Sequence, residues 1–181
     1  ESMKISTEGS DYVINGRDTK LSIDKSTGQV SGWSHDGTVI TDQAIRPNFW
    51  RAPTDNDLGN GMHEWAKVWK DATEEAVSTL SEAPHQTEIG IAFSLDYQLP
   101  GEIAQLTIDY VVTPKGALMV DYNFKPLKDS LPNIPRLGIF MTLPNVFTET
   151  SWYGRGPFET YWDRKTAGKI GIYEGAVKDQ F

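Results

Sequence analysis

Residues 49–59 gather the side chains of this sequence that are best suited to binding a polar small molecule. Aromatic, basic, acidic and amide side chains lie next to turn-forming residues there, in the order Phe49, Trp50, Arg51, Ala52, Pro53, Thr54, Asp55, Asn56, Asp57, Leu58, Gly59. Aromatic faces bury the apolar side of a sugar ring, while Arg, Asp and Asn hold hydroxyl groups in fixed directions. The segment therefore indicates a polar binding rim, whose candidate substrate-binding residues are Arg51, Asp55, Asn56 and Asp57. The alternative is a tight loop whose Asp and Asn side chains bond their own backbone.

A second dense segment, residues 152–164, also combines aromatic rings with charges. Its sequence is Trp152, Tyr153, Gly154, Arg155, Gly156, Pro157, Phe158, Glu159, Thr160, Tyr161, Trp162, Asp163, Arg164. In a binding role, a sugar would stack on one ring while Glu159, Asp163 or Arg164 held its hydroxyl groups. Charges beside buried rings more often pair with each other. We therefore expect Phe158 and Tyr161 to pack inward and Asp163 and Arg164 to form a partly buried pair.

The sequence lacks the motifs for metal, nucleophilic and phosphate chemistry. His63 and Glu64 begin like a zinc-binding helix, but Lys67 stands where the second His is required. No serine lies in a strained Gly-x-Ser-x-Gly turn, and Pro157 lacks the backbone donor that a phosphate-binding loop needs. A pair of facing carboxyl groups for glycoside hydrolysis cannot be picked out among 25 Asp and Glu residues. We expect no catalytic residue, no metal and no cofactor.

Composition narrows the classes of partner. The chain has 181 residues and a formal net charge of -8, and its Lys and Arg residues are scattered. Nucleic acids and anionic membranes both reward clustered positive charge, so we expect neither as a partner. The chain has no cysteine, which rules out disulfides and thiolate chemistry but assigns no compartment.

Alternating apolar and polar residues predict an all-β fold with one short helix. The alternation is the period of a strand with one buried face, and it is clearest over residues 89–97, 106–112 and 118–124. Pro114, Lys115 and Gly116 supply a turn between the last two of these strands. Shorter apolar pieces over residues 21–23, 30–33 and 39–40 predict a second meander, and residues 137–143 predict one more strand.

The helix is predicted over residues 62–71, because Met62, Trp65 and Trp69 are spaced to share one helix face. Aromatic residues at such spacing usually belong to the core, so we expect Trp65 and Trp69 both to be buried against the sheet. Residues 125–135 contain three prolines without periodicity and predict a long surface connection.

Taken together, the two dense segments resemble the small-chain, C-terminal β-sandwich domain of the β-galactosidases of glycoside hydrolase family 2. The first family segment runs as Trp or Thr, Arg, Ala, Pro, any residue, Asp, Asn, Asp, an aliphatic residue and Gly, followed by a helix that contains Trp. Residues 50–59 and 65–70 match that pattern. The second family segment has Gly, any residue, Gly and Pro, then Glu, Tyr and an Asp and Arg pair, and residues 154–164 match it.

The resemblance implies a fold and a place in a larger enzyme. The implied fold is an antiparallel supersandwich similar to that of galactose mutarotases, as a single domain over residues 1–181 that stops short of the family's C-terminal end. In that family both catalytic glutamates lie on a (β/α)8 barrel domain, which would be the partner of this chain. The loop from Asp55 to Gly61 would approach the galactoside, while Arg51 and Asp57 would either contact the sugar or brace the loop. Strand edges left unpaired could also support association between copies.

Three functions follow as hypotheses. The leading one is an accessory domain that helps shape the galactoside pocket of a β-galactosidase and has no hydrolytic activity of its own. The second is an aldose mutarotase or epimerase, which would need a His and Glu pair for proton transfer. The third is a free-standing carbohydrate-binding module with an aromatic platform, for which Trp50 is the natural candidate.

Overall fold

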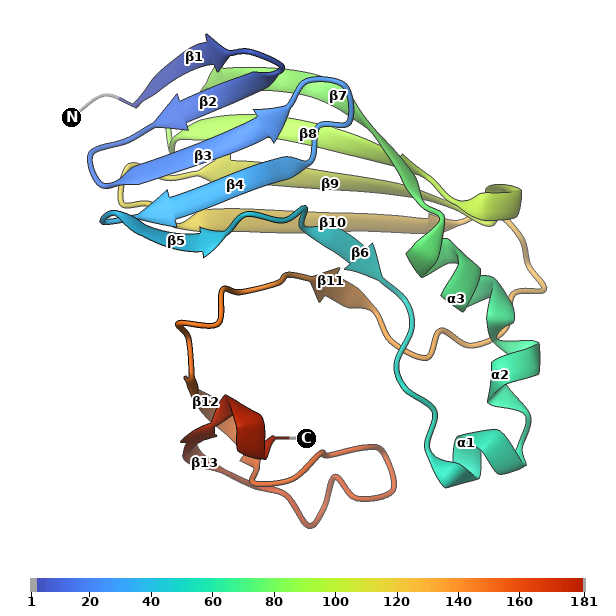
Figure 1. The fold of residues 1–181 in the computed structure, drawn as a ribbon. Helices are drawn as coiled ribbons and strands as arrows, with labels where there is room; N and C mark the ends of the chain where they lie inside the picture. The colour runs from blue at the N-terminus through green and yellow to red at the C-terminus, as the bar shows by residue number, and fades with distance from the viewer. Residues whose placement is uncertain (1–2, 181) are drawn as a thin grey trace. The chain divides into compact units, whose positions relative to one another are not determined.

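The computed structural model describes residues 3–180, and within them the chain forms four antiparallel sheets and a few short helices (Figure 1). The all-β, antiparallel class is confirmed, whereas the supersandwich arrangement stays a prediction. The strands are β1 (Lys4–Glu8), β2 (Asp11–Asn15), β3 (Thr19–Asp24), β4 (Val30–His35), β5 (Thr38–Thr41), β6 (Arg46–Asn48), β7 (Val77–Gln86), β8 (Ile91–Gln98), β9 (Ala104–Val112), β10 (Leu118–Pro126), β11 (Gly138–Phe140), β12 (Glu149–Gly156) and β13 (Lys169–Ala176). The helices are α1 (Asp55–Gly59), α2 (Met62–Trp65) and α3 (Lys67–Glu74), with 3-10 turns η1 (Pro100–Glu102) and η2 (Val177–Asp179).

The chain divides into two compact units, one ending at Thr142 and the other beginning at Leu143. The single domain over residues 1–181 therefore stays a prediction. None of the helices in residues 3–180 has the length and apolar character needed to cross a lipid bilayer.

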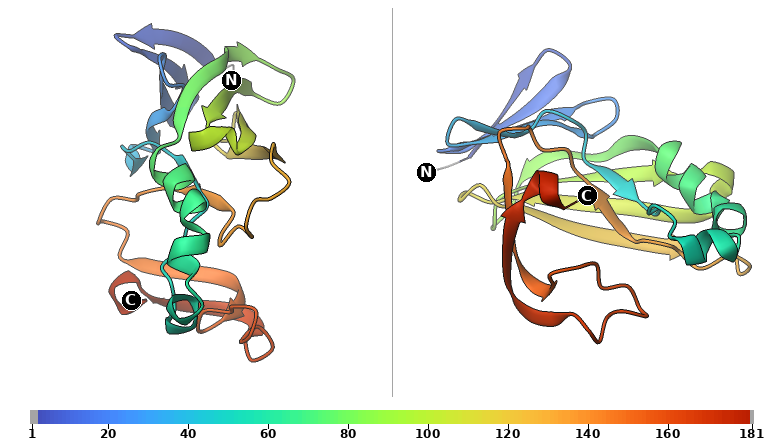
Figure 2. Two further views of the ribbon diagram at one scale, coloured as in Figure 1. Left: turned by 90° about the vertical axis from the view of Figure 1, so that its right-hand side faces the viewer. Right: turned by 60° about the horizontal axis from the view of Figure 1, so that its bottom comes forward.

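Two meanders form the body of the first unit (Figure 2). Strands β1 to β5 follow one another in one sheet, and β7 to β10 follow one another in a second. The turn predicted at residues 114–116 joins β9 to β10, where the Thr113 amide donates to Ala117 O over 2.9 Å. Gly116 adopts a φ of 81° there, a left-handed conformation that favours glycine. Short turns of this kind explain why neighbouring strands in the sequence are neighbours in each sheet.

The core lies between residues that alternate along the strands, as the sequence pattern predicts. Along β8 and β9 every second side chain is buried, and the buried set joins residues of β3 and β4 in one hydrophobic cluster. Gly28, between β3 and β4, has a φ of 72°, and a Cβ there would lie 2.8 Å from Leu95 Cγ. The close approach of this turn to β8 therefore requires glycine. The predicted strand over residues 89–97 begins later than expected, because Ile89 precedes β8 and is 57% exposed.

Two short helices, α2 and α3, replace the single helix predicted over residues 62–71, and a further one, α1, precedes them. The backbone leaves helical geometry at Gly61, which has a φ of 74°, and again at Ala66, where φ is -99° and ψ is 7°. This second break separates Trp65 from Trp69, so the two rings do not share a helix face. Trp69 is 1% exposed as expected, but the prediction that Trp65 is buried is wrong, because its side chain is 44% exposed.

Trp69 anchors α3 to the core. Its ring centroid lies 5.8 Å from that of Phe49 and 6.0 Å from that of Phe124, and Nε1 donates to Pro132 O over 2.9 Å. Pro132 belongs to the irregular connection after β10, which the sequence predicts from its prolines. One buried side chain thus joins α3, the segment after β6, strand β10 and that connection.

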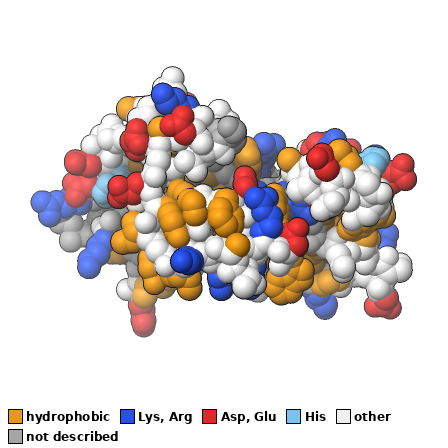
Figure 3. Space-filling model, turned by 90° about the horizontal axis from the view of Figure 1, so that it is seen from below, with side chains coloured by type: hydrophobic (Ala, Val, Ile, Leu, Met, Phe, Trp, Pro, Cys, Tyr) orange, Lys and Arg blue, Asp and Glu red, His pale blue; other side chains and the backbone are white. Residues whose placement is uncertain are grey.

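The second unit consists mainly of the β12–β13 hairpin. Trp152 and Tyr173 face each other across the two strands, and their rings stack with a centroid distance of 5.4 Å. Hydrophobic side chains are visible at the surface in Figure 3, and in this unit the exposed ones include Tyr153, Ile170 and Ile172.

The Trp69 anchor gives a stability prediction. Trp69→Ala removes a fully buried ring and its hydrogen bond, so the free energy of unfolding should fall by about 3–5 kcal/mol. Trp65→Ala is the matched control, because Trp65 is 44% exposed whereas Trp69 is 1% exposed, and its effect on stability should be less than about 1 kcal/mol. Chemical denaturation followed by far-UV circular dichroism measures both. Equal losses for the two variants would contradict the anchoring role.

Candidate functional site

The segment predicted as a binding rim leaves the core at Phe49. The Phe49 ring is fully buried, and its amide donates to Thr73 Oγ1 of α3 over 2.8 Å. The Trp50 amide donates to Asn48 Oδ1 over 3.0 Å. Because both contacts tie the backbone to neighbouring elements, the start of the segment has a fixed position and direction.

A clamp between Arg51 and Asp57 closes the segment on itself. Arg51 Nη1 donates to Asp57 Oδ2, and Nη2 donates to Asp57 Oδ1 over 3.0 Å. The Thr54 amide and hydroxyl add bonds to Asp57 Oδ2 of 2.8 Å and 2.9 Å. The side chains of Arg51 and Asp57 are only 21% and 13% exposed. A bidentate ion pair in this partly buried environment is stronger and more rigid than an ion pair on the surface.

The electrostatics of the clamp follow from these hydrogen bonds. The bond from Arg51 is the largest cause that holds the pKa of the Asp57 carboxyl well below its usual range, and the bonds from Thr54 act in the same direction. Asp57 therefore stays ionised over the whole physiological pH range. An acid held in this state cannot donate a proton, so its role is electrostatic and structural.

The same residues begin helix α1. Thr54 is the N-cap, and with Asp57 it forms a capping box in which each side chain bonds the other residue's backbone amide. Asp55 and Asp57 lie in the first turn, where negative charge is favoured by the helix dipole. Helix α1 buries none of its residues, so these polar contacts replace a hydrophobic anchor.

The four predicted site residues thus divide into two pairs. Arg51 and Asp57 are bonded to each other and brace the segment, which is one of the two roles the sequence left open for them. Asp55 and Asn56 are exposed on α1. That any of the four binds substrate stays a prediction.

Sequence reasoning missed two features of this region. Thr54 completes the clamp, and its position three residues before Asp57 is the recognisable signal of a capping box. Trp65 leaves its ring exposed, and its Nε1 donates to Asn60 Oδ1 over 3.3 Å. The exposed ring therefore lies close to the turn that ends α1.

A pocket of about 330 Å³ opens beside the clamp. It is lined by residues of β6, β11, the segments next to them and helix α3: Arg46, Pro47, Asn48, Trp50, Arg51, Ala52, Thr73, Arg136 and Phe140. The sequence does not indicate this pocket, because Arg46 and Arg136 lie far apart in the chain. They are brought together by the antiparallel pairing of β6 with β11.

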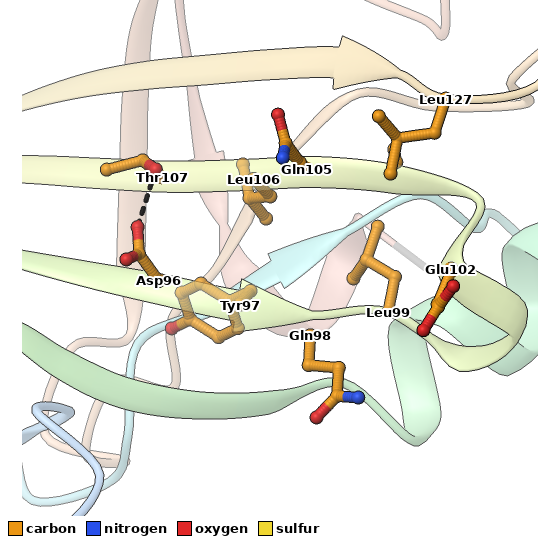
Figure 4. Close-up of a pocket in the computed structure, with 10 residues that line it drawn as sticks. Asp96, Tyr97, Gln98, Leu99, Glu102, Gln105, Leu106, Thr107 and Leu127 are labelled. Carbon is orange, nitrogen blue, oxygen red and sulfur yellow. Dashed lines mark hydrogen bonds between the residues drawn. The ribbon is translucent and has the colours of Figure 1, made fainter.

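A larger hollow, of about 500 Å³, lies at the end of strands β8 and β9 near η1 (Figure 4). Polar side chains such as Asp96, Gln98 and Gln105 line it, and Asp96 already accepts a 2.6 Å hydrogen bond from Thr107. The only ring in its lining, that of Tyr97, belongs to a residue that is 4% exposed. Since a sugar site needs an accessible aromatic face, this hollow is a weaker candidate than residues 49–59.

The second dense segment differs from its prediction. Phe158 is partly exposed, and Asp163 and Arg164 are both exposed and form no ion pair with each other among the described residues. The Arg164 guanidinium instead lies 5.7 Å from the Phe158 ring centroid. The expected inward packing of Phe158 and the buried Asp163 pair are therefore wrong, because residues 157–164 run as an irregular loop between β12 and β13 rather than across a core.

Within residues 3–180, no group of three or more His, Asp or Glu side chains is arranged to hold a metal ion.

Comparison with known proteins points to one family. The family model described as "Beta galactosidase small chain" matches residues 15–181. The chain is 34% identical over 92% of its length to a β-galactosidase of Priestia megaterium, 29% identical over its full length to one of Pseudoalteromonas haloplanktis, and 32% identical over 84% of its length to one of Lactobacillus delbrueckii subsp. bulgaricus. It spans only 16%, 19% and 16% of those three proteins.

The clamp predicts a pH-dependent local stability of α1. A folded pKa below the unfolded value of about 3.9 means that ionised Asp57 stabilises the segment above that pH, and that this stability is lost as pH falls below it. Hydrogen exchange at the Leu58 and Asn60 amides, which donate to Thr54 O and Asn56 O, reports α1 opening. Asp57→Asn should lower the protection of these two amides against hydrogen exchange about tenfold or more at neutral pH. In this variant the protection should no longer fall when the pH drops below about 4. Asp55→Asn is the control, and an equal effect from it would contradict the clamp.

Proposed function

Because this chain belongs to the β-galactosidase small-chain family, we propose that it forms part of the wall of the galactoside pocket in a β-galactosidase whose catalytic groups lie elsewhere in the molecule. The chain spans less than a fifth of its relatives, so the rest of such an enzyme has ample length for a catalytic domain. The resemblance assigns that role to a barrel domain, which is the proposed partner.

The observation that carries the proposal is the rigid presentation of α1. The Arg51–Asp57 clamp fixes the helix, and Asp55 and Asn56 on this helix are not buried in the core. Polar side chains held in place before a ligand arrives bind sugar hydroxyls with a smaller entropy cost than mobile ones. In this proposal Asp55 and Asn56 contact the galactoside, directly or through water, and the clamp positions them.

Two carboxyl groups of the chain are held in a state that does not suit acid catalysis. A glycoside hydrolase needs a carboxylic acid whose pKa is raised so that it can protonate the leaving group. Hydrogen bonds lower the pKa of Asp57, and bonds from Ser26 and Thr27 lower that of Asp24 to about 2. These two carboxylates are therefore unsuited to acid catalysis.

The two other hypotheses receive less support. A mutarotase needs His and Glu in a shared pocket, whereas His63 and His85 lie beside Glu64 and Glu82 on the exposed surface. A binding module needs an exposed platform, whereas the Trp50 ring is partly buried against the core. Both observations favour the accessory role.

The proposal predicts the effect of α1 substitutions on the whole parent enzyme. Asp55→Ala and Asn56→Ala should each lower kcat/KM for a galactoside by about 10- to 100-fold, the range expected for losing a hydrogen bond to a polar ligand. Thermal stability should not change, because neither side chain is buried. Asp42→Ala, another exposed aspartate outside α1, is the control.

Steady-state kinetics on the parent enzyme and its variants provide the measurement. Unchanged kcat/KM for both α1 variants would contradict the contact with substrate. Robust galactoside hydrolysis by residues 1–181 alone, abolished by one local carboxylate substitution, would overturn the accessory role itself.

A further inference from the structure

The pocket beside the clamp is lined by one face of the β6–β11 ribbon. In the register of this pair, Arg46 lies opposite Phe140, and Asn48 lies opposite Gly138. Since side chains alternate along a strand, Arg46 and Asn48 face the same way, and Trp50, two residues after the end of β6, lines the same pocket. Arg136, whose amide donates to Phe49 O, continues the facing row beyond Gly138. With Arg51, three arginines and the rings of Trp50 and Phe140 therefore surround one hollow.

The middle of this ribbon is open. Gly138 occupies the position between Arg136 and Phe140, and a Cβ built there would meet no atom within 4 Å. Its φ is not in the left-handed region, so the backbone itself does not require glycine. Space for a side chain from another molecule is thus available next to the two arginines.

The charge of the pocket is unusual for this chain. Three of the six arginines of a protein with a net charge of -8 line it. Arg51 is paired with Asp57, but within residues 3–180 neither Arg46 nor Arg136 forms an ion pair or a side-chain hydrogen bond. Both arginines are exposed and line the same pocket, and like charges there would be stabilised by an anion that binds between them.

Resting on the function proposed above, we propose that this pocket docks an Asp or Glu side chain from the remainder of the parent enzyme. A carboxylate matches the planar fork of arginine, and Arg together with large aromatic residues is enriched at the centres of protein interfaces. Phe140 is 51% exposed and offers apolar surface for the stem of such a side chain. The pocket then fixes the chain in the position from which α1 reaches the substrate site.

Substitutions at Gly138 test the proposal with a matched pair. Gly138→Asp and Gly138→Asn add side chains of the same shape into the open space, but only Asp supplies a carboxylate that competes for the arginines. In the isolated chain, the Asp variant should unfold at a higher temperature than the Asn variant. In the parent enzyme the order should reverse, with the Asp variant unfolding about 2 °C or more below the Asn variant, because its own carboxylate displaces that of the partner.

Differential scanning calorimetry measures both proteins without relying on activity. Equal unfolding temperatures for the two parent variants, or a higher one for Asp, would overturn the proposal. Dissociation of a parent oligomer by the Asp variant, with protomer stability unchanged, would identify a second copy as the occupant and also overturn it.

A second pair of variants covers the case in which an added side chain at Gly138 prevents folding. Arg46→Ala should lower the unfolding temperature of the parent enzyme, whereas Arg17→Ala, at an exposed arginine outside the pocket, should not. Equal effects would contradict the docking role. Failure of the proposed function is recognised separately, because kcat/KM for a galactoside would then be unchanged in the Asp55→Ala and Asn56→Ala variants.

Discussion

The Arg51–Asp57 pair holds in place a short helix, α1, that lies between two buried aromatic residues and has no hydrophobic anchor of its own. The chain leaves the core at Phe49 and returns to it at Met62, and the Phe49 ring packs 5.8 Å from that of Trp69. Helix α1 lies between them and buries no side chain, so hydrophobic burial cannot hold it. Charge-assisted hydrogen bonds in a half-buried setting supply the order that packing does not. Everything proposed for this region depends on these hydrogen bonds holding α1 in place of hydrophobic packing.

The clamp also explains why the acidic residues of one short segment have different roles. The Asp57 carboxylate accepts its hydrogen bonds from Arg51 and Thr54, and the resulting low pKa keeps it charged. Asp55 and Asn56, on the neighbouring positions of α1, remain exposed to solvent. A rigid base with polar side chains projecting from it is the arrangement that ligand-contacting segments need. The pocket beside the clamp, the arginine pocket, is the proposed docking site through which the rest of the parent enzyme holds this segment.

Sequence patterns predicted those parts of the fold in which one physical rule dominates. Strands β8 to β10 followed from strict alternation, because one face of each must be buried. The helical region was only partly predictable, since spacing alone does not show that the backbone breaks at Gly61 and Ala66 and turns Trp65 outward. The candidate binding segment, residues 49–59, was recognisable from residue types in one short stretch. The arginine pocket was not, because it depends on the pairing of β6 with β11, which no local pattern encodes.

The most direct test of this account is a double-mutant cycle on the clamp. Arg51→Ala, Asp57→Ala and the double variant would be compared by the free energy of α1 opening, obtained from hydrogen exchange at the Leu58 amide. If the pair holds the helix, the two substitutions should be coupled by more than about 1 kcal/mol, with the double variant little worse than either single one. Additive effects, with coupling near zero, would contradict the clamp and remove the basis for placing Asp55 and Asn56 at a substrate site.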